Sequence, residues 1–129
     1  MSDGPLTGTV LEFTRTMEGL VADGDPPPDW GPLAEFVAVD QFERVGTFRE
    51  VQDWQQYTGM LTQWASSVDK FEASVQRISE VANLVFFEIE ERHHRAGEVH
   101  VVNSMTVFDF DEHGKIRRLN VYLQQGRAA

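Results

Sequence analysis

The sequence predicts a single α+β domain, with helices before residue 68 and an antiparallel sheet after residue 70. In the first half, apolar residues recur every three or four positions, which is typical of helices packed on one face. From Lys70 onward they alternate with polar residues, which is typical of strands. The 129 residues, 41% of them hydrophobic and 25% charged, match one globular domain spanning 1–129.

The charge balance excludes several classes of partner. Eleven Lys and Arg oppose 21 Asp and Glu, a formal net charge of -10. Such a chain repels phosphate backbones and anionic lipids, so we expect no nucleic acid and no membrane as a partner, and a polyanionic substrate is disfavoured. The chain has no cysteine, no apolar run of about 20 residues and no recognisable secretory signal, which favours a cytoplasmic location.

Three helices are predicted before the sheet. Thr9 and Glu12 have the spacing of a capping box, and the apolar stripe behind them ends before Asp25–Pro28. A short helix over 30–37 and a short strand over 39–45 follow.

A second capping box, Thr47 with Glu50, predicts the start of the longest helix. Aromatic and aliphatic residues recur behind it over about five turns. A helix of this kind packs against a core or lines a ligand cavity, and both interpretations stay open. Its apolar positions are Val51, Trp54, Tyr57, Leu61, Trp64 and Val68.

Turn signals allow the register of the sheet to be estimated. A two-residue turn at Ala96–Gly97 would place His93 opposite His100, and a four-residue turn at 111–114 would place Thr106 opposite Leu119. A bulge is expected at Arg77–Ile78. The predicted strands run from residue 70 onward and over 84–95, 98–110 and 116–123. One face would then carry Phe87, Ile89, Glu91, His93, His100, Val102, Ser104, Thr106, Phe108, Leu119, Val121 and Leu123.

Glu91, His93 and His100 form a polar group on this mainly apolar face. They could be an acid–base pair, a divalent metal site, or polar residues at the solvated rim of the sheet. The rim is the favoured interpretation, and we expect no metal and no cofactor.

The element order resembles the nuclear-transport-factor-2-like cone, over about residues 6–124. The segments 106–123 and 36–46 are similar to the ketosteroid isomerases, and the SnoaL-like polyketide cyclases are the other near relatives. The resemblance implies a cone-shaped, curved antiparallel or mixed sheet wrapped around helices. It also implies a homodimer through the outer face of the sheet, where Met105, Val107 and Tyr122 lie among polar residues.

The resemblance transfers to individual residues only in part. Glu43 lies three residues before Gly46, where the isomerases have their general base. The positions of their two oxyanion donors hold Met17, which has no proton to donate, and Thr106, which has a hydroxyl. We therefore expect no efficient isomerase oxyanion hole, although Tyr57 could partly replace the missing donor.

The resulting expectation is a cofactor-independent isomerase, cyclase or hydrolase for a small apolar or polycyclic ligand. Glu43 would be the general acid–base group, with Tyr57, Thr106 and His93 as donors. The expected ligand pocket comprises Met17, Trp54, Leu61, Trp64, Phe87, Ile89, Glu91, Ser104, Phe108, Leu119, Val121 and Leu123.

Two other functions stay open. The first is a non-catalytic ligand-binding or dimerising accessory domain of the same fold, which the missing oxyanion donors favour. The second, ranked lower, is epoxide opening, which requires an Asp–Arg–Asp arrangement inside the cone. Arg92 is expected on the outer face of the sheet and could not supply that arginine.

Overall fold

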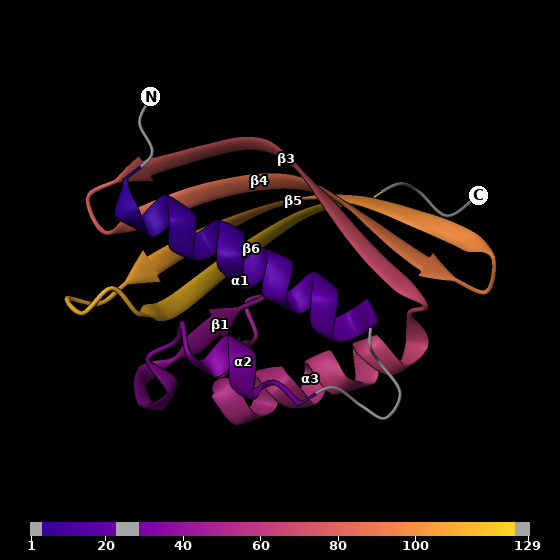
Figure 1. Cartoon of the computed structure of the whole chain (residues 1–129), viewed down its shortest axis with the longest axis horizontal. Coiled ribbons are helices and arrows are strands. Elements are labelled where there is room, and N and C mark those ends of the chain that lie inside the picture. The colour runs from indigo at the N-terminus through magenta and orange to yellow at the C-terminus, as the bar shows by residue number, and fades with distance from the viewer. Residues whose placement is uncertain (1–3, 23–28, 126–129) are drawn as a thin grey trace.

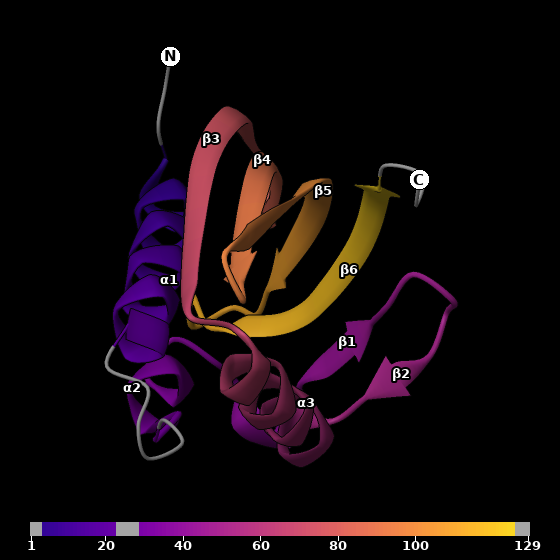
Figure 2. The same cartoon turned by 90° about the vertical axis from the view of Figure 1, so that its right-hand side faces the viewer.

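The computed structural model describes residues 4–22 and 29–125, which form one curved sheet with its helices on the concave side (Figures 1 and 2). None of the helices in these residues has the length and apolar character needed to cross a membrane. The elements are α1 (Pro5–Ala22), α2 (Gly31–Ala34), the 3-10 turn η1 (Val39–Gln41), β1 (Glu43–Val45), β2 (Val51–Gln52), α3 (Trp54–Ser67), β3 (Lys70–Val81), β4 (Leu84–Arg95), β5 (Glu98–Phe110) and β6 (Ile116–Gln125).

The sheet has six strands in the order β2-β1-β6-β5-β4-β3. All neighbours are antiparallel except β1 and β6, which are parallel, so the sheet is mixed. This architecture confirms the predicted α+β class.

Helix α1 covers the free edge of the sheet at β3. The Glu18 carboxylate accepts a hydrogen bond from the backbone N–H of Ala73 over 2.8 Å. Near the start of the helix, Glu80 accepts from the backbone N–H and the hydroxyl of Thr7, at 2.8 and 3.0 Å. These contacts satisfy edge and helix-end groups that would otherwise need water.

The sheet follows the predicted register closely. Strands β4 and β5 have the predicted bounds, and His93 pairs with His100. Ala96 and Gly97 both have positive φ, at 50° and 81°, as a type I′ turn requires. Strand β3 shifts register between Val75 and Arg77, where a bulge was expected.

The register of β6 differs from the prediction by two residues. Thr106 pairs with Val121 rather than with Leu119, because five residues separate β5 from β6 and the ladder shifts between Asp109 and Phe110. Since side chains alternate with a period of two, this offset leaves every residue on its predicted face.

The helix starts are where the sequence interpretation was wrong. Helix α1 begins at Pro5, so Thr9 lies inside the helix and does not cap it. Pro5 is favoured in a first turn, and Glu80 supplies the acceptor from a distant strand. The helix expected over 30–37 is shorter, and η1 replaces the first part of the strand expected over 39–45. The expected stop at 25–28 lies outside the described residues.

Helix α3 begins at Trp54 rather than near Thr47. The Asp53 carboxylate accepts from the Gln56 N–H over 2.8 Å, and the Gln56 side chain accepts from the Asp53 N–H over 3.0 Å. Thr47 and Glu50 instead belong to the loop between β1 and β2, where Arg49 has a φ of 66°. The predicted capping box at Thr47 and Glu50 is therefore wrong, and the box that starts α3 lies six residues further along the chain.

The apolar core fills the space between the helices and the concave face. Phe13 of α1 packs edge-on against Phe108 of β5, with ring centroids 6.0 Å apart. The largest fully buried side chains are those of Phe110, Leu33, Ile116, Val10 and Val85. This core supports the strands of the concave face.

Candidate functional site

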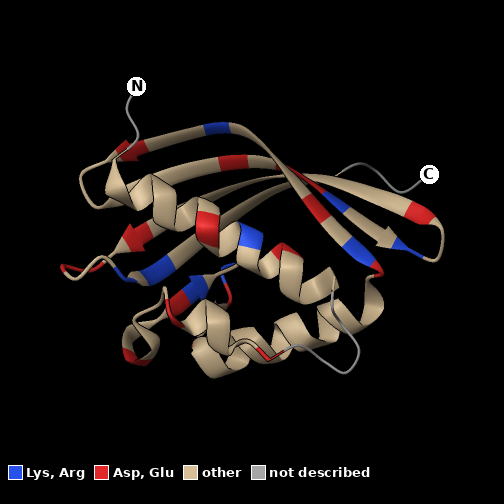
Figure 3. Cartoon of the chain, in the orientation of Figure 1, with Lys and Arg blue, Asp and Glu red and all other residues tan. Residues whose placement is uncertain are grey.

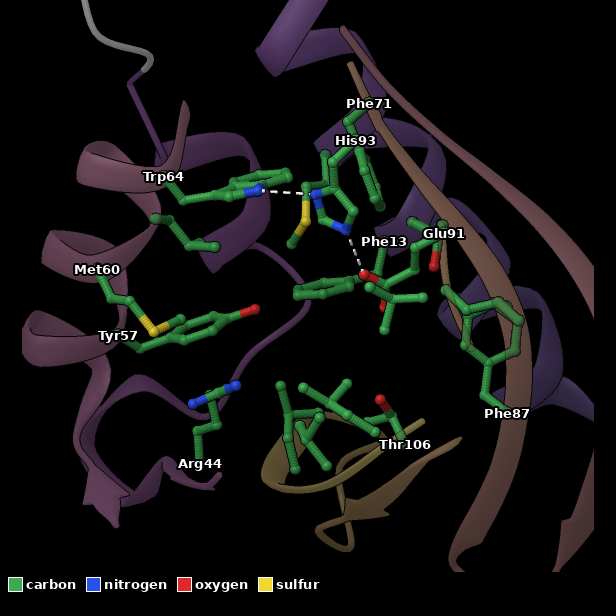
Figure 4. A pocket seen from close by; sticks show the side chains of 18 of the residues that line it. Phe13, Arg44, Tyr57, Met60, Trp64, Phe71, Phe87, Glu91, His93 and Thr106 are labelled. Carbon is green, nitrogen blue, oxygen red and sulfur yellow. Dashed lines mark hydrogen bonds and ion pairs between the residues drawn. The ribbon is translucent and has the colours of Figure 1, made fainter. Parts of the chain in front are cut away.

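A cavity of about 430 Å³ lies between the concave face of the sheet, α1 and α3 (Figure 4). This volume is in the range of small-molecule sites. The expected residues that line it are Met17, Tyr57, Leu61, Trp64, Phe87, Ile89, Glu91, His93, Thr106, Phe108, Leu119, Val121 and Leu123. Residues not singled out from the sequence as site residues also line it, including Phe13, Arg44, Met60, Phe71 and Arg95.

Two residues expected in the pocket do not line it. Trp54 packs edge-on against Phe42, with ring centroids 5.2 Å apart, and is half-buried against the apolar core. Ser104 is buried and donates its hydroxyl proton to Glu91 over 2.6 Å. Ser104 therefore supports a cavity residue without lining the cavity.

Glu43 does not line the cavity, contrary to the expectation from the sequence. Its side chain is 52% exposed, and one carboxylate oxygen lies 3.8 Å from the guanidinium of Arg118. Because side chains alternate along β1, the next residue, Arg44, points inward instead. The side chain that β1 directs into the cone is therefore the cation of Arg44 and not the carboxylate of Glu43.

The carboxylate inside the cavity is that of Glu91 on β4. His93 Nε2 lies 2.8 Å from one Glu91 oxygen, and the Ser104 hydroxyl donates to the other. On the far side of the imidazole, Trp64 Nε1 lies 3.0 Å from His93 Nδ1 (Figure 4). A chain of hydrogen bonds therefore connects α3 to the sheet through Glu91.

The hydrogen bonds assign the tautomer of His93. An indole N–H is only a donor, so Nδ1 must accept and carries no proton. The remaining proton is on Nε2 and is donated to Glu91. His93 then orients the Glu91 carboxylate, which also accepts from the Ser104 hydroxyl.

Tyr57 and Arg44 form the second polar part of the cavity. Burial raises the pKa of Tyr57 to about 12, the nearby Arg44 cation opposes this rise, and the Glu91 charge adds to it. Tyr57 is therefore a neutral phenol at physiological pH, and its hydroxyl points into the cavity (Figure 4). The Arg44 guanidinium carbon lies 5.9 Å from the centre of the Tyr57 ring.

Other polar contacts hold Arg44 in place. Its side chain is 13% exposed, donates to Gln52 over 3.1 Å and lies 3.7 Å from a Glu50 oxygen. No signal in the sequence identified Arg44, because the three residues of β1 are too few for alternation to show which side chains point inward.

The metal interpretation of Glu91, His93 and His100 gains no support. Within 4–22 and 29–125, no group of three or more His, Asp or Glu side chains is arranged to hold a metal ion. His100 lines the cavity, and it pairs with His93 across the ladder as predicted.

No family model and no curated protein matches the sequence. The fold is nevertheless similar to solved structures. A protein assigned as a SnoaL-like polyketide cyclase from Jannaschia sp. CCS1 has a TM-score of 0.71 at 14% identity, over 96% of this chain and 91% of that one. An NTF2-like protein from Anabaena variabilis ATCC 29413 has a TM-score of 0.70 at 15% identity, over 98% and 96%.

This chain has the nuclear-transport-factor-2-like fold. A third structure of the same fold is SalBIII, an epoxide hydrolase/cyclase-like enzyme in pyran ring formation of the polyether salinomycin. Its TM-score is 0.70 at 13% identity, over 92% of this chain and 90% of that one. The TM-scores establish the nuclear-transport-factor-2-like fold. Identities this low establish no activity.

Proposed function

We propose that the chain is a small-molecule enzyme that transfers protons at a carbon next to a carbonyl group, with Glu91 as the general base. The observation that carries the proposal is a carboxylate oriented by His93 and Ser104 inside a largely apolar cavity. The substrate would have an apolar body, since aromatic and aliphatic side chains form most of the lining. Isomerisation and cyclisation are the two reactions that this chemistry serves.

In the proposed reaction, Glu91 accepts the proton of the C–H bond next to the carbonyl, and the electron pair moves to the carbonyl oxygen. Tyr57 stabilises the resulting enolate oxygen by donating its hydroxyl proton, and the nearby positive charge of Arg44 adds to this stabilisation. The proton then returns to a different carbon in an isomerisation. In a cyclisation, the enolate carbon attacks a second carbonyl of the same substrate, and the alkoxide that forms takes the proton back from Glu91.

The proposal transfers the role of base from Glu43 to Glu91 and keeps Tyr57 as a donor. His93 becomes a positioning residue because its Nε2 proton is donated to Glu91. Thr106 lines the cavity and remains a second possible donor to the substrate. Arg44 supplies a cation that the sequence interpretation lacked.

The test is hydrogen–deuterium exchange of ketone probes in D₂O, followed by mass spectrometry. The probes are 2-tetralone, 2-decalone and androst-5-ene-3,17-dione. The wild-type protein should accelerate exchange at the carbon next to the carbonyl. Glu91→Gln should slow it by about 10²- to 10⁴-fold, the usual contribution of a general base.

Glu43→Gln is the matched control, because it removes the same charge outside the cavity. It should exchange probes at the wild-type rate, and both variants should keep the wild-type melting temperature. Equal rates for Glu91→Gln and wild type would overturn the proposed base. A loss confined to Glu43→Gln would return that role to Glu43.

A non-catalytic ligand-binding domain is the second candidate function. The observation that favours it is that both oxygens of Glu91 already accept hydrogen bonds, as they would in a purely structural role. Probe binding without accelerated exchange by the wild type would support this candidate. Failure of every probe to bind would support a dimerising accessory domain.

Epoxide opening ranks below these candidates. Arg44 supplies an arginine inside the cone, but no aspartate is among the residues found to line the cavity in the described part of the chain. A terpenoid epoxide added to the probe panel tests this reaction through the appearance of a diol.

The outer face of the sheet supports a homodimer as part of the proposal. Tyr122 is 61% exposed there, and Met105 and Val107 are half-buried around it. The side-chain oxygen of Asn103 on the same strand is buried without a hydrogen-bond partner among the described residues. Sedimentation velocity should give a dimer at micromolar concentration, and Tyr122→Glu should give a monomer.

A further inference from the structure

The cavity has a charge opposite in sign to that of the whole chain. The chain has a formal net charge of -10, yet among the described residues the cavity lining includes two arginines, Arg44 and Arg95, and a single acid, Glu91. Helix α3 contributes no charge, since none of its residues is Lys, Arg, Asp or Glu (Figure 3). The ionised groups of the cavity therefore come from the sheet, and cations outnumber the carboxylate.

Arg95 is the cation without a partner. It lies at the end of β4, and its Nε is buried with no hydrogen-bond partner among the described residues. No ion pair joins its guanidinium to an acidic side chain within 4–22 and 29–125. A buried N–H donor of a charged group is rarely left without an acceptor. Burial removes its hydrogen bond to water, and no protein group takes the place of that bond.

The acidic residues near Arg95 do not compensate it. Glu98 is its partner across the ladder of β4 and β5 but forms no ion pair with it. Asp69 uses a carboxylate oxygen to accept the backbone N–H of Ala96 over 3.1 Å. Arg44, in contrast, is already occupied by Gln52, Glu50 and the Tyr57 ring.

We propose that the cavity binds an amphipathic monocarboxylate and that Arg95 is the residue that anchors its carboxylate group. This inference rests on the cavity being the ligand site of the proposed function, and it names the substrate class. A guanidinium is planar and matches a carboxylate through two parallel hydrogen bonds. The apolar body of the ligand would lie against Trp64 and Phe71. In this position the ligand extends from Arg95 toward Glu91.

A single negative charge fits the cavity better than a double one. Glu91 lies in the same cavity and repels a second negative charge, and Arg44 is engaged elsewhere. The negative field of the chain also opposes a polyanion. The ligand class is therefore an apolar carboxylic acid rather than a phosphate ester.

The test is isothermal titration calorimetry with three probes of one shape: 2-naphthoate, its neutral analogue 2-naphthamide, and 2-naphthyl phosphate. The wild type should bind naphthoate at least about tenfold more tightly than naphthamide, the size expected for one charge-assisted hydrogen bond. Arg95→Met should abolish this preference, with a larger loss of affinity for naphthoate than for naphthamide. Arg92→Met, on the same strand but on the outer face, should keep the preference.

Equal affinities of the wild type for naphthoate and naphthamide would overturn the inference, and this comparison needs no variant. A preference that survives in folded Arg95→Met would overturn the role of Arg95, and tighter binding of naphthyl phosphate would overturn the ligand class. Because the readout is binding, the outcome is independent of catalysis. A carboxylate preference without deuterium exchange would sustain this inference while the proposed enzyme activity fails.

Discussion

Trp64 on α3 donates its indole proton to Nδ1 of His93 on β4 over 3.0 Å. The bond makes the tautomer of His93 depend on α3 as well as on the sheet. As long as Nδ1 accepts from Trp64, the imidazole is neutral and its Nε2 proton points to Glu91. Protonation of Nδ1 would have to break the contact between α3 and β4.

Replacing Trp64 should therefore change the tautomer of His93. Trp64→Phe keeps an aromatic ring against Phe71 but removes the donor to Nδ1. We expect long-range ¹H–¹⁵N NMR spectra to show a single Nε2–H tautomer in the wild type and a mixture in the variant. Trp54→Phe is the matched control on the same helix. A wild-type spectrum with Nδ1 protonated would contradict the hydrogen-bond assignment.

Tyr57 should make the fold less stable at high pH. Burial raises its pKa to about 12 in the folded state, from an ordinary value of 10.0. Between these values the unfolded chain loses the phenolic proton while the folded chain keeps it. The contribution of Tyr57 to the free energy of unfolding is therefore fully present below pH 10 and is lost as the pH rises toward 12. The loss amounts to about 3 kcal/mol at most.

The measurement is the free energy of unfolding in urea at pH 9, 10 and 11. The part of the decline in unfolding free energy that Tyr57 causes is the difference between the curves of the wild type and Tyr57→Phe. The titration of lysine contributes equally to both curves. Tyr122→Phe should keep the full decline, since Tyr122 is 61% exposed. Parallel curves for wild type and Tyr57→Phe would contradict the raised pKa.

The sheet was largely predictable because its signals are local. Turn residues between β4 and β5 determine the register of two long strands, so Glu91 and His93 could be placed on the concave face together. The register of β6 was misjudged by two residues, and because side chains alternate with a period of two, every residue still lies on its predicted face. An error of one residue would have inverted the face.

The same sensitivity explains why Glu43 was expected inside the cavity. Strand β1 has three residues, too few for alternation to reveal which side chains point inward. Similarity to a family motif selected Glu43, and the actual inward side chain is its neighbour Arg44. The unpartnered Arg95 was equally hidden, because the absence of a partner is a property of the packed structure.

Long-range contacts were beyond the reach of sequence patterns. Glu80 supports the start of α1 from 73 residues away, and Trp64 reaches His93 across 29 residues. Neither spacing belongs to a local motif. Capping boxes are local motifs, but the sequence contains several candidates. Only tertiary packing determines which candidate starts a helix.

Two capping candidates before α3 allow this selection to be measured. Asp53→Ala removes the acceptor for the Gln56 N–H and should lower the free energy of unfolding by about 1 kcal/mol. Thr47→Ala removes the candidate favoured by the sequence pattern and should change it by less than about 0.5 kcal/mol, as expected for a surface loop residue. Both are measured by urea denaturation at pH 7. The reverse order of the two effects would show that α3 begins at Thr47 in solution and that the loop between β1 and β2 is helical.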